Sequence, residues 1–82
     1  MILKILTPSA IAFEGEVNSV VVPASDGLLG ILRDHAPILA SLKRGTVQYK
    51  SGNKTNEVAI ENGFLEVKDN LISILTDDAT TE

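Results

Sequence analysis

The stretch NEVAIENGFLEVKDNLISILT, residues 56–76, decides the fold class. It holds three short segments rich in valine, isoleucine and leucine, each followed by polar turn residues. In the first segment Val58 and Ile60 fall on one face, while Glu57 and Glu61 fall on the other. Apolar residues at a period of two are typical of a β-strand that buries one face. This stretch therefore predicts three consecutive strands.

The same pattern extends over most of the chain. Asn62-Gly63, Asp69-Asn70 and Ser51-Gly52-Asn53 are residue types that tolerate the backbone conformations of tight turns. The predicted strands cover the N-terminal MILKILTP and residues 16–23, 46–50, 56–62, 64–68 and 71–76. Strands and turns that repeat every 8 to 12 residues or so predict an antiparallel sandwich or barrel. No α-helix of three turns is expected.

Composition indicates one folded domain over residues 1–82, with a frayed tail from about residue 77. Hydrophobic residues make up 44% of the 82 residues and charged residues 22%, which is ordinary for a folded chain. The chain has no cysteine, so it has neither disulfides nor thiolate metal sites, and this fits a reducing compartment. A net charge of −4 argues against nucleic-acid binding. The sequence has no signal peptide and no long apolar segment, so we expect a soluble protein.

Candidate catalytic residues do not form a recognisable set. Ser25, Asp26 and His35 are the types found in a nucleophilic triad, but no nucleophile elbow surrounds the serine, and Ser25-Asp26-Gly27 is typical of a turn. His35 is the single histidine, and no carboxylates stand at metal-ligand spacing around it. GLLG, residues 27–30, lacks the lysine and hydroxyl of a phosphate loop. We expect no catalytic residue, metal or cofactor.

An excess of apolar residues marks the segment from residue 28 to residue 42. Seven large aliphatic residues crowd into it: Leu28, Leu29, Ile31, Leu32, Ile38, Leu39 and Leu42. They are more than one face of an alternating strand can hide. Two interpretations stay open, a strand buried on both sides or a patch that binds a partner protein.

Three segments resemble the N-terminal domain of the epsilon subunit of F-type ATP synthase. They are FEGEV (13–17), DGLLGILRDHAPILASLKRG (26–45) and NGFLEVKDNLISILTDDA (62–79), in the same order and at the same spacings as in that family. The resemblance implies a two-sheet antiparallel β-sandwich, which the alternation predicts independently. It also implies a non-catalytic subunit of the central stalk that binds the gamma subunit and rests on the polar loops of the membrane c-ring. Such a subunit lies peripherally on the cytoplasmic face of the bacterial inner membrane.

The resemblance also assigns residues to the ring contact. In the family the contact loop lies between the second strand and the His-Ala-Pro turn, so the residues carried over are Ser25, Asp26, Gly27, Leu28, Arg33 and His35. Two positions depart from the family pattern. Leu28 stands where many members carry a polar side chain, and Arg33-Asp34 replaces a commoner Pro-Gly turn. The Leu28 departure predicts a more apolar ring contact.

Most family members continue into a hairpin of two helices. That hairpin is associated with inhibition of ATP hydrolysis and, in some members, with ATP binding. The sequence ends at Glu82, so we expect this C-terminal helical domain to be absent and expect neither property of the chain.

Two other protein classes are compatible with a small acidic all-β domain. Lipoyl and biotinyl carriers present a lysine at a hairpin tip, and Lys50 and Lys54 flank such a turn, but without the neighbouring residues that carriers need. A small β-fold enzyme would need acid, base and nucleophile in one polar cleft, and the sequence shows no convergent set.

Overall fold

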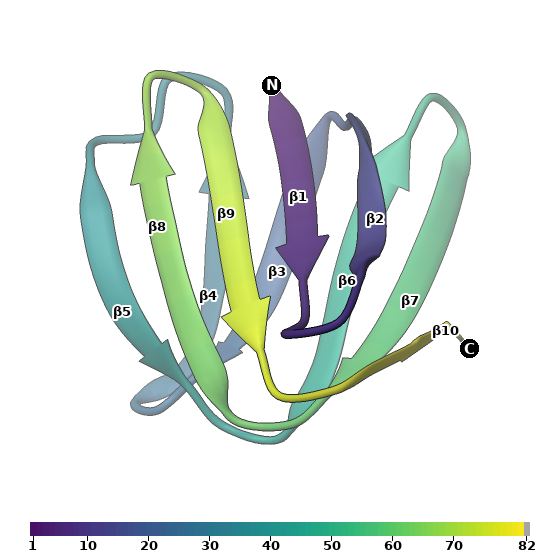
Figure 1. The fold of residues 1–82 in the computed structure, drawn as a ribbon. Coiled ribbons are helices and arrows are strands. Elements are labelled where there is room, and N and C mark those ends of the chain that lie inside the picture. The colour runs from purple at the N-terminus through teal and green to yellow at the C-terminus, as the bar shows by residue number, and fades with distance from the viewer. Residues whose placement is uncertain (82) are drawn as a thin grey trace.

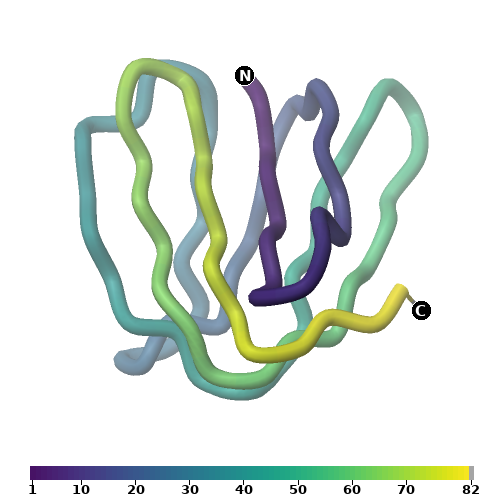
Figure 2. The backbone as a smooth tube through the Cα atoms, in the orientation of Figure 1, coloured from purple at the N-terminus to yellow at the C-terminus, as the bar shows by residue number. Residues whose placement is uncertain are grey.

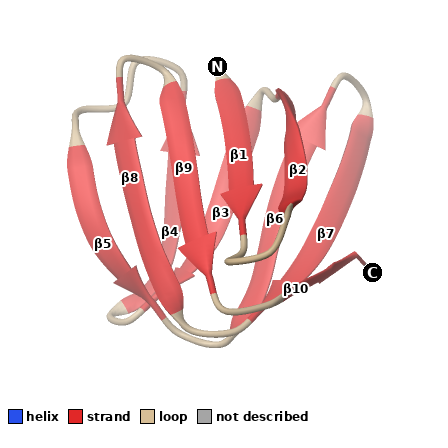
Figure 3. Cartoon of the chain, viewed as in Figure 1, coloured by secondary structure: helices blue, strands red, loops and turns tan. Residues whose placement is uncertain are grey.

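The computed structural model of the chain describes residues 1–81, which contain ten β-strands and no helix (Figures 1 and 3). No helix in this range is therefore long and apolar enough to cross a membrane. The strands are β1 (Ile2–Leu6), β2 (Ile11–Glu16), β3 (Ser19–Ala24), β4 (Gly27–Leu32), β5 (Ile38–Leu42), β6 (Gly45–Ser51), β7 (Lys54–Ile60), β8 (Gly63–Lys68), β9 (Leu71–Thr76) and β10 (Ala79–Thr81).

The strands form two layers of one continuous hydrogen-bonded sheet, which confirms the predicted β-sandwich (Figure 1). The front layer runs β5-β8-β9-β1-β2, and the back layer runs β4-β3-β6-β7-β10. The layers join where Ala24 of β3 pairs with Leu42 of β5. Every pair is antiparallel except β1 with β9, so the N-terminal strand lies beside the strand near the C-terminus (Figure 2).

The core fills the space between the two inner faces. Because side chains alternate along a strand, every second side chain points into this space. The most deeply buried residues come from both layers. Twelve large side chains have about 2% of their surface exposed or less: Leu3, Ile5, Ile31, Ile60, Leu65, Ile72, Ile74, Val17, Val20, Val22, Val47 and Val67. Phe13 of β2 stacks on Tyr49 of β6 with ring centroids 4.4 Å apart, which closes the side of the sandwich opposite β5. Burial raises the pKa of the Tyr49 phenol above its ordinary value.

Two predictions about strand limits are wrong. Residues 16–23 do not form one strand, because Val17 turns into the core and Asn18 lies between β2 and β3. The expected fraying from residue 77 is also not what the structure shows, since Ala79–Thr81 form β10 and pair with β7. The hydroxyl of Thr76 supports this extension, because it lies 3.1 Å from the carbonyl oxygens of Glu61, Asn62 and Asp78.

Leu65 tests the assignment of the core. Its side chain is 0% exposed, so Leu65→Ala is expected to lower the free energy of unfolding by about 2–5 kcal/mol, through lost burial and the cavity left behind. Urea denaturation followed by circular dichroism measures the change. Leu39→Ala is the control, because that side chain is 78% exposed and its truncation should change stability by less than about 0.5 kcal/mol. Equal losses in both variants would contradict the assignment.

Candidate functional site

The turn between β3 and β4 holds the first group of predicted contact residues. Ala24 pairs with Gly27 and leaves Ser25 and Asp26 as the two-residue loop. Gly27 has a φ of 128°, a backbone conformation that would be strained in a residue with a Cβ atom, so glycine suits this position. Asp26 is exposed, and Leu28 is 77% exposed at the start of β4. The turn therefore presents polar groups beside one apolar side chain.

Ser25 links this turn by hydrogen bonds to strand β5 of the front layer. Its backbone N–H donates to the carbonyl of Ser41 at 2.9 Å, and its hydroxyl donates to the same oxygen at 3.2 Å. Ser41 belongs to β5, which is hydrogen-bonded to β8. The turn is thus held in a defined position relative to the front layer.

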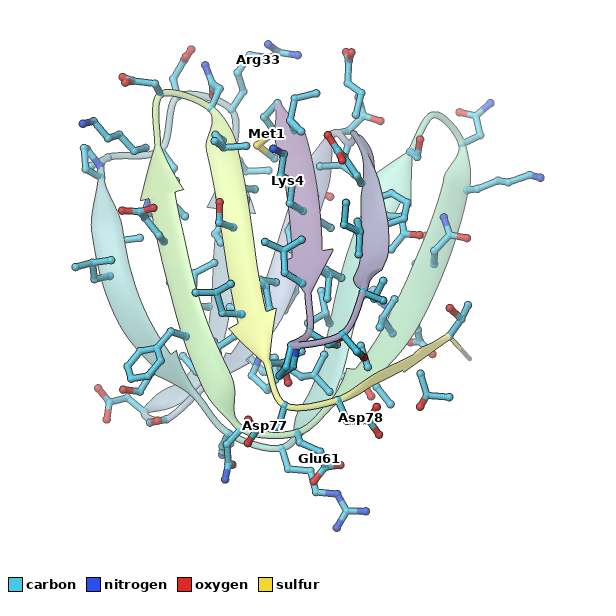
Figure 4. All side chains as sticks on the ribbon, viewed as in Figure 1. Met1, Lys4, Arg33, Glu61, Asp77 and Asp78 are labelled. Atoms are coloured by element: carbon cyan, nitrogen blue, oxygen red, sulfur yellow. The ribbon has the colours of Figure 1, made fainter. Side chains whose placement is uncertain are left out.

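Arg33 and His35 lie at the other end of β4 from this turn. A six-residue strand is about 17–20 Å long, so the structure does not bring these two residues together with Ser25 and Asp26. Arg33 is exposed and lies at the end of the sandwich opposite Glu61, Asp77 and Asp78 (Figure 4). The predicted ring-contact residues therefore form two groups.

His35 is half-buried and engaged locally. Its Nδ1 lies 2.7 Å from the carbonyl oxygen of Ala36, and its backbone N–H donates to the carbonyl of Leu32 at 3.1 Å. The separation from Ser25 argues against a triad of Ser25, Asp26 and His35. Among residues 1–81, no group of three or more histidine, aspartate and glutamate side chains is placed to hold a metal ion.

A reciprocal pair of hydrogen bonds fixes the connection that carries Arg33 and His35. The N–H of Asp34 donates to Oδ1 of Asn70 at 2.7 Å, and Nδ2 of Asn70 donates to Oδ1 of Asp34 at 3.0 Å. Both residues have positive φ, 64° and 62°, a conformation that aspartate and asparagine tolerate better than most. The β4–β5 connection is thereby tied to the β8–β9 turn.

A second candidate surface is a row of apolar side chains on the outer face of the front layer. Register places Phe64 of β8 opposite Leu75 of β9, Leu75 opposite Leu6 of β1, and Leu6 opposite Ile11 of β2. The exposed fractions of Phe64, Leu75 and Ile11 are 63%, 53% and 62%. Leu39 of β5 lies on the same face, opposite Glu66 and diagonally beside Phe64. We call the four residues in register, together with Leu39, the apolar row. Exposed apolar side chains grouped in this way indicate a protein interaction surface.

The apolar row borders a shallow groove and a polar margin. Leu6, Leu39, Ser41, Phe64 and Leu75 are among the residues that line the groove. The adjacent row along the same strands is mostly polar, and it contains Glu66, Ser73, Lys4 and Glu14. Within it Nζ of Lys4 lies 3.9 Å from Oε2 of Glu14. An apolar centre with a polar rim is the usual composition of a protein interface.

Most of the apolar row lies outside the segment that stands out in the sequence for its apolar excess, residues 28–42. Only Leu39 belongs to both. That excess is divided in the structure, because Ile31 and Leu42 are buried while Leu28, Leu32 and Leu39 are exposed on two layers. A signal for the other residues of the row exists in adjacent apolar pairs such as Phe64-Leu65 and Ile74-Leu75. Neighbours in a strand face opposite sides, so one member of each pair must point outward.

The two surfaces meet at one end of the sandwich. Ser41 pairs with Phe64 in the front layer, and the same Ser41 carbonyl accepts both hydrogen bonds from Ser25. The β3–β4 turn and the apolar row are therefore connected through a single residue, and a rigid sheet holds both.

Residues 1–82 match the family described as ATP synthase, Delta/Epsilon chain, beta-sandwich domain. The chain belongs to this family. The curated relatives that this chain matches are ATP synthase epsilon chains. The ATP synthase epsilon chain of Leptospira borgpetersenii is 47% identical over 75 residues, which are 92% of this chain and 59% of the relative. The Chlorobium limicola epsilon chain is 44% identical over 79 residues, which are 95% of this chain and 90% of that relative.

The chain thus spans about three-fifths of the Leptospira relative and nine-tenths of the Chlorobium one. Two solved structures share the fold of this chain at low sequence identity. A chain in the Euglena gracilis mitochondrial ATP synthase, titled as OSCP/F1/c-ring in rotational state 1, superposes with a TM-score of 0.91 at 24% identity, over 99% of this chain and 52% of that chain. A chain in the central stalk/c-ring structure of Tetrahymena thermophila mitochondrial ATP synthase gives 0.80 at 16% identity, over 95% and 63%.

Asn70 tests the hydrogen-bonded link between the two connections. Asn70→Gly keeps the positive φ accessible and removes both hydrogen bonds to Asp34, so it should lower the free energy of unfolding by about 1 kcal/mol. Amide exchange is the more specific measurement, because the Asp34 N–H loses its acceptor and should exchange faster. Unchanged exchange at Asp34 would show that the bond contributes nothing in solution.

Proposed function

We propose that the chain is a non-catalytic adaptor of the ATP synthase central stalk. In this role it joins the gamma subunit to the membrane c-ring during rotary, proton-driven ATP synthesis. The observation that carries the proposal is the junction at Ser41, where two distinct exposed surfaces meet on one rigid sandwich. Family membership and the epsilon-chain relatives support it. The chain would then act as one β-sandwich domain, peripheral on the cytoplasmic face of the inner membrane.

The apolar row is the surface we assign to the gamma subunit. A permanent contact within a rotating stalk needs a well-packed apolar area that does not slip under load. Phe64 and Leu39 supply the largest exposed apolar groups next to the groove. A large aromatic side chain that packs fully into a partner is a common energetic anchor of an interface, and Phe64 is the only aromatic member of the row.

The β3–β4 turn is the surface we assign to the polar loops of the c-ring. The exposed Asp26 offers a carboxylate, and the Ser25 hydroxyl, whose proton is donated to Ser41, can still accept a hydrogen bond; both suit contacts that fix orientation. Leu28 adds an apolar contact beside them. Arg33 and His35 lie at the far end of β4, so a ring contact that includes them would run along the whole length of that strand.

Phe64 tests the gamma contact. Phe64→Glu puts a carboxylate into the apolar row, so binding to the gamma subunit is expected to weaken at least about tenfold, because a charge would be buried without a partner. Isothermal titration into the matching gamma subunit measures the affinity, and circular dichroism checks that the fold is intact. An unchanged affinity in a folded variant would reject the assignment of this face.

Leu28 tests the ring contact and serves as the matched control. Leu28→Asp is expected to weaken binding of the gamma–epsilon complex to purified c-ring several-fold and to leave gamma binding unchanged, since Leu28 is 77% exposed on the other layer. Phe64→Glu should show the opposite selectivity. If both variants weaken the same contact, the two-surface arrangement is wrong.

A further inference from the structure

One edge of strand β4 lacks a partner within residues 1–81. β4 pairs with β3 on one side and with no strand on the other. Pro23 shows which groups face the open side. Its carbonyl accepts from the N–H of Lys43, so the backbone of Pro23 faces away from β4 and the Pro23–Leu28 pair is not hydrogen-bonded. By the alternation of an antiparallel ladder, the N–H and C=O groups of Leu28 and Gly30 and the N–H of Leu32 point to the open edge. The Leu32 carbonyl already accepts the N–H of His35 at 3.1 Å, so of the three carbonyls only those of Leu28 and Gly30 lack a donor from residues 1–81 on this side.

This edge lacks the devices that normally prevent strand pairing. The strand GLLGIL has no charged residue and no proline, and Leu28 and Leu32 are 77% and 66% exposed on its outer face. Proteins protect such edges with charges, prolines, bulges or short strands. The other edges show these features, because β2 carries exposed Glu14 and Glu16 and β10 has three residues.

The free edge of β5 offers fewer backbone groups for pairing with another strand. Pro37 precedes the strand, and at its other end Ser41 already accepts hydrogen bonds from Ser25. β4 therefore offers the longer unprotected edge on this side of the sandwich.

The sequence of β4 is complementary to itself about Gly30. When two copies run antiparallel with Gly30 opposite Gly30, Leu28 lies opposite Leu32 and Leu29 lies opposite Ile31. The open-edge groups of one copy then face those of the other, and Gly30 has open space where a Cβ would stand. Two leucine pairs pack on the outer face, one on each side of the glycines. This register is the isologous arrangement that a twofold dimer requires.

Charges beyond the strand fit the same register. Arg33 of one copy comes opposite Gly27 of the other, next to the exposed Asp26 in the partner's turn. The twofold axis repeats this pairing at the other end of the strand. Opposite charges at both ends favour this register over one shifted along the edge.

We propose that a second copy of this chain docks on β4, pairing β4 with β4 in a twofold antiparallel ladder centred on Gly30. The contact is limited to a short strand and its outer leucines, so the dimer forms reversibly and at high concentration. It covers Asp26 and Leu28, which means that a dimerised chain has no free β3–β4 turn. The inference rests on the edge geometry alone and does not depend on the proposed stalk function.

Sedimentation velocity of the 82-residue chain tests the proposal. Over a range from about 10 µM to about 1 mM, the weight-average mass should rise from one towards two monomer masses. Leu32→Lys places a charge on the edge and should reduce the association constant at least about tenfold. Leu39→Lys is the matched control, because it makes the same substitution at a leucine of similar exposure on the other layer, and it should leave the association unchanged.

A cross-link tests the register. Residues opposite each other in a hydrogen-bonded antiparallel pair have Cα atoms about 5.5 Å apart, within reach of a disulfide. The chain has no cysteine of its own, so Gly30→Cys should give a disulfide-linked dimer under mild oxidation, and Thr55→Cys on β7 should not.

Three results would overturn the proposal. The chain stays monomeric over the whole concentration range, or Leu32→Lys associates as the unmodified chain does, or Gly30→Cys cross-links no faster than Thr55→Cys. Loss of association in Leu39→Lys instead would place self-association on the apolar row and would equally reject the β4 edge.

Discussion

The parallel pairing of β1 with β9 is the contact on which the rest of the structure depends. It joins the first strand of the chain to the ninth, and it brings Leu3 and Ile5, both 0% exposed, into the core beside Ile72 and Ile74. A parallel pair cannot be made by a tight turn, so this contact forms only when most of the chain is in place. The same pairing sets Leu6 opposite Leu75 and thereby makes the apolar row continuous across the front layer.

Two closures then make the sandwich a rigid body. On one side Ala24 pairs with Leu42, and on the other Phe13 stacks on Tyr49. A turn held by two hydrogen bonds to Ser41 cannot move independently of the strand beside it. Rigidity of this kind suits the adaptor role proposed above, because transmission of torque would require fixed relative positions of the two contact surfaces.

Strand β4 shows how one short segment carries several properties at once. Ile31 fills the core, while Leu28 and Leu32 face outward and the backbone edge stays open. One strand can carry all three properties because its groups point in three directions: inward side chains, outward side chains, and backbone N–H and C=O groups in the plane of the sheet. The two proposed partners, a second copy on the edge and the c-ring on the turn, would compete, because both would cover Leu28.

The sequence by itself determined the β class, the inward face of each regular strand and several turns. Val58, Ile60 and Leu65 were predictable as core because alternation and turn chemistry are local properties of a few neighbouring residues. It did not determine β10, the β1–β9 pair or the outward position of Phe64 and Leu75. Nor did it show that Ser25 and His35 lie at opposite ends of β4. Those features were decided by the tertiary structure alone, because a period of two says which residues share a face but not which strand lies alongside or which face meets the core.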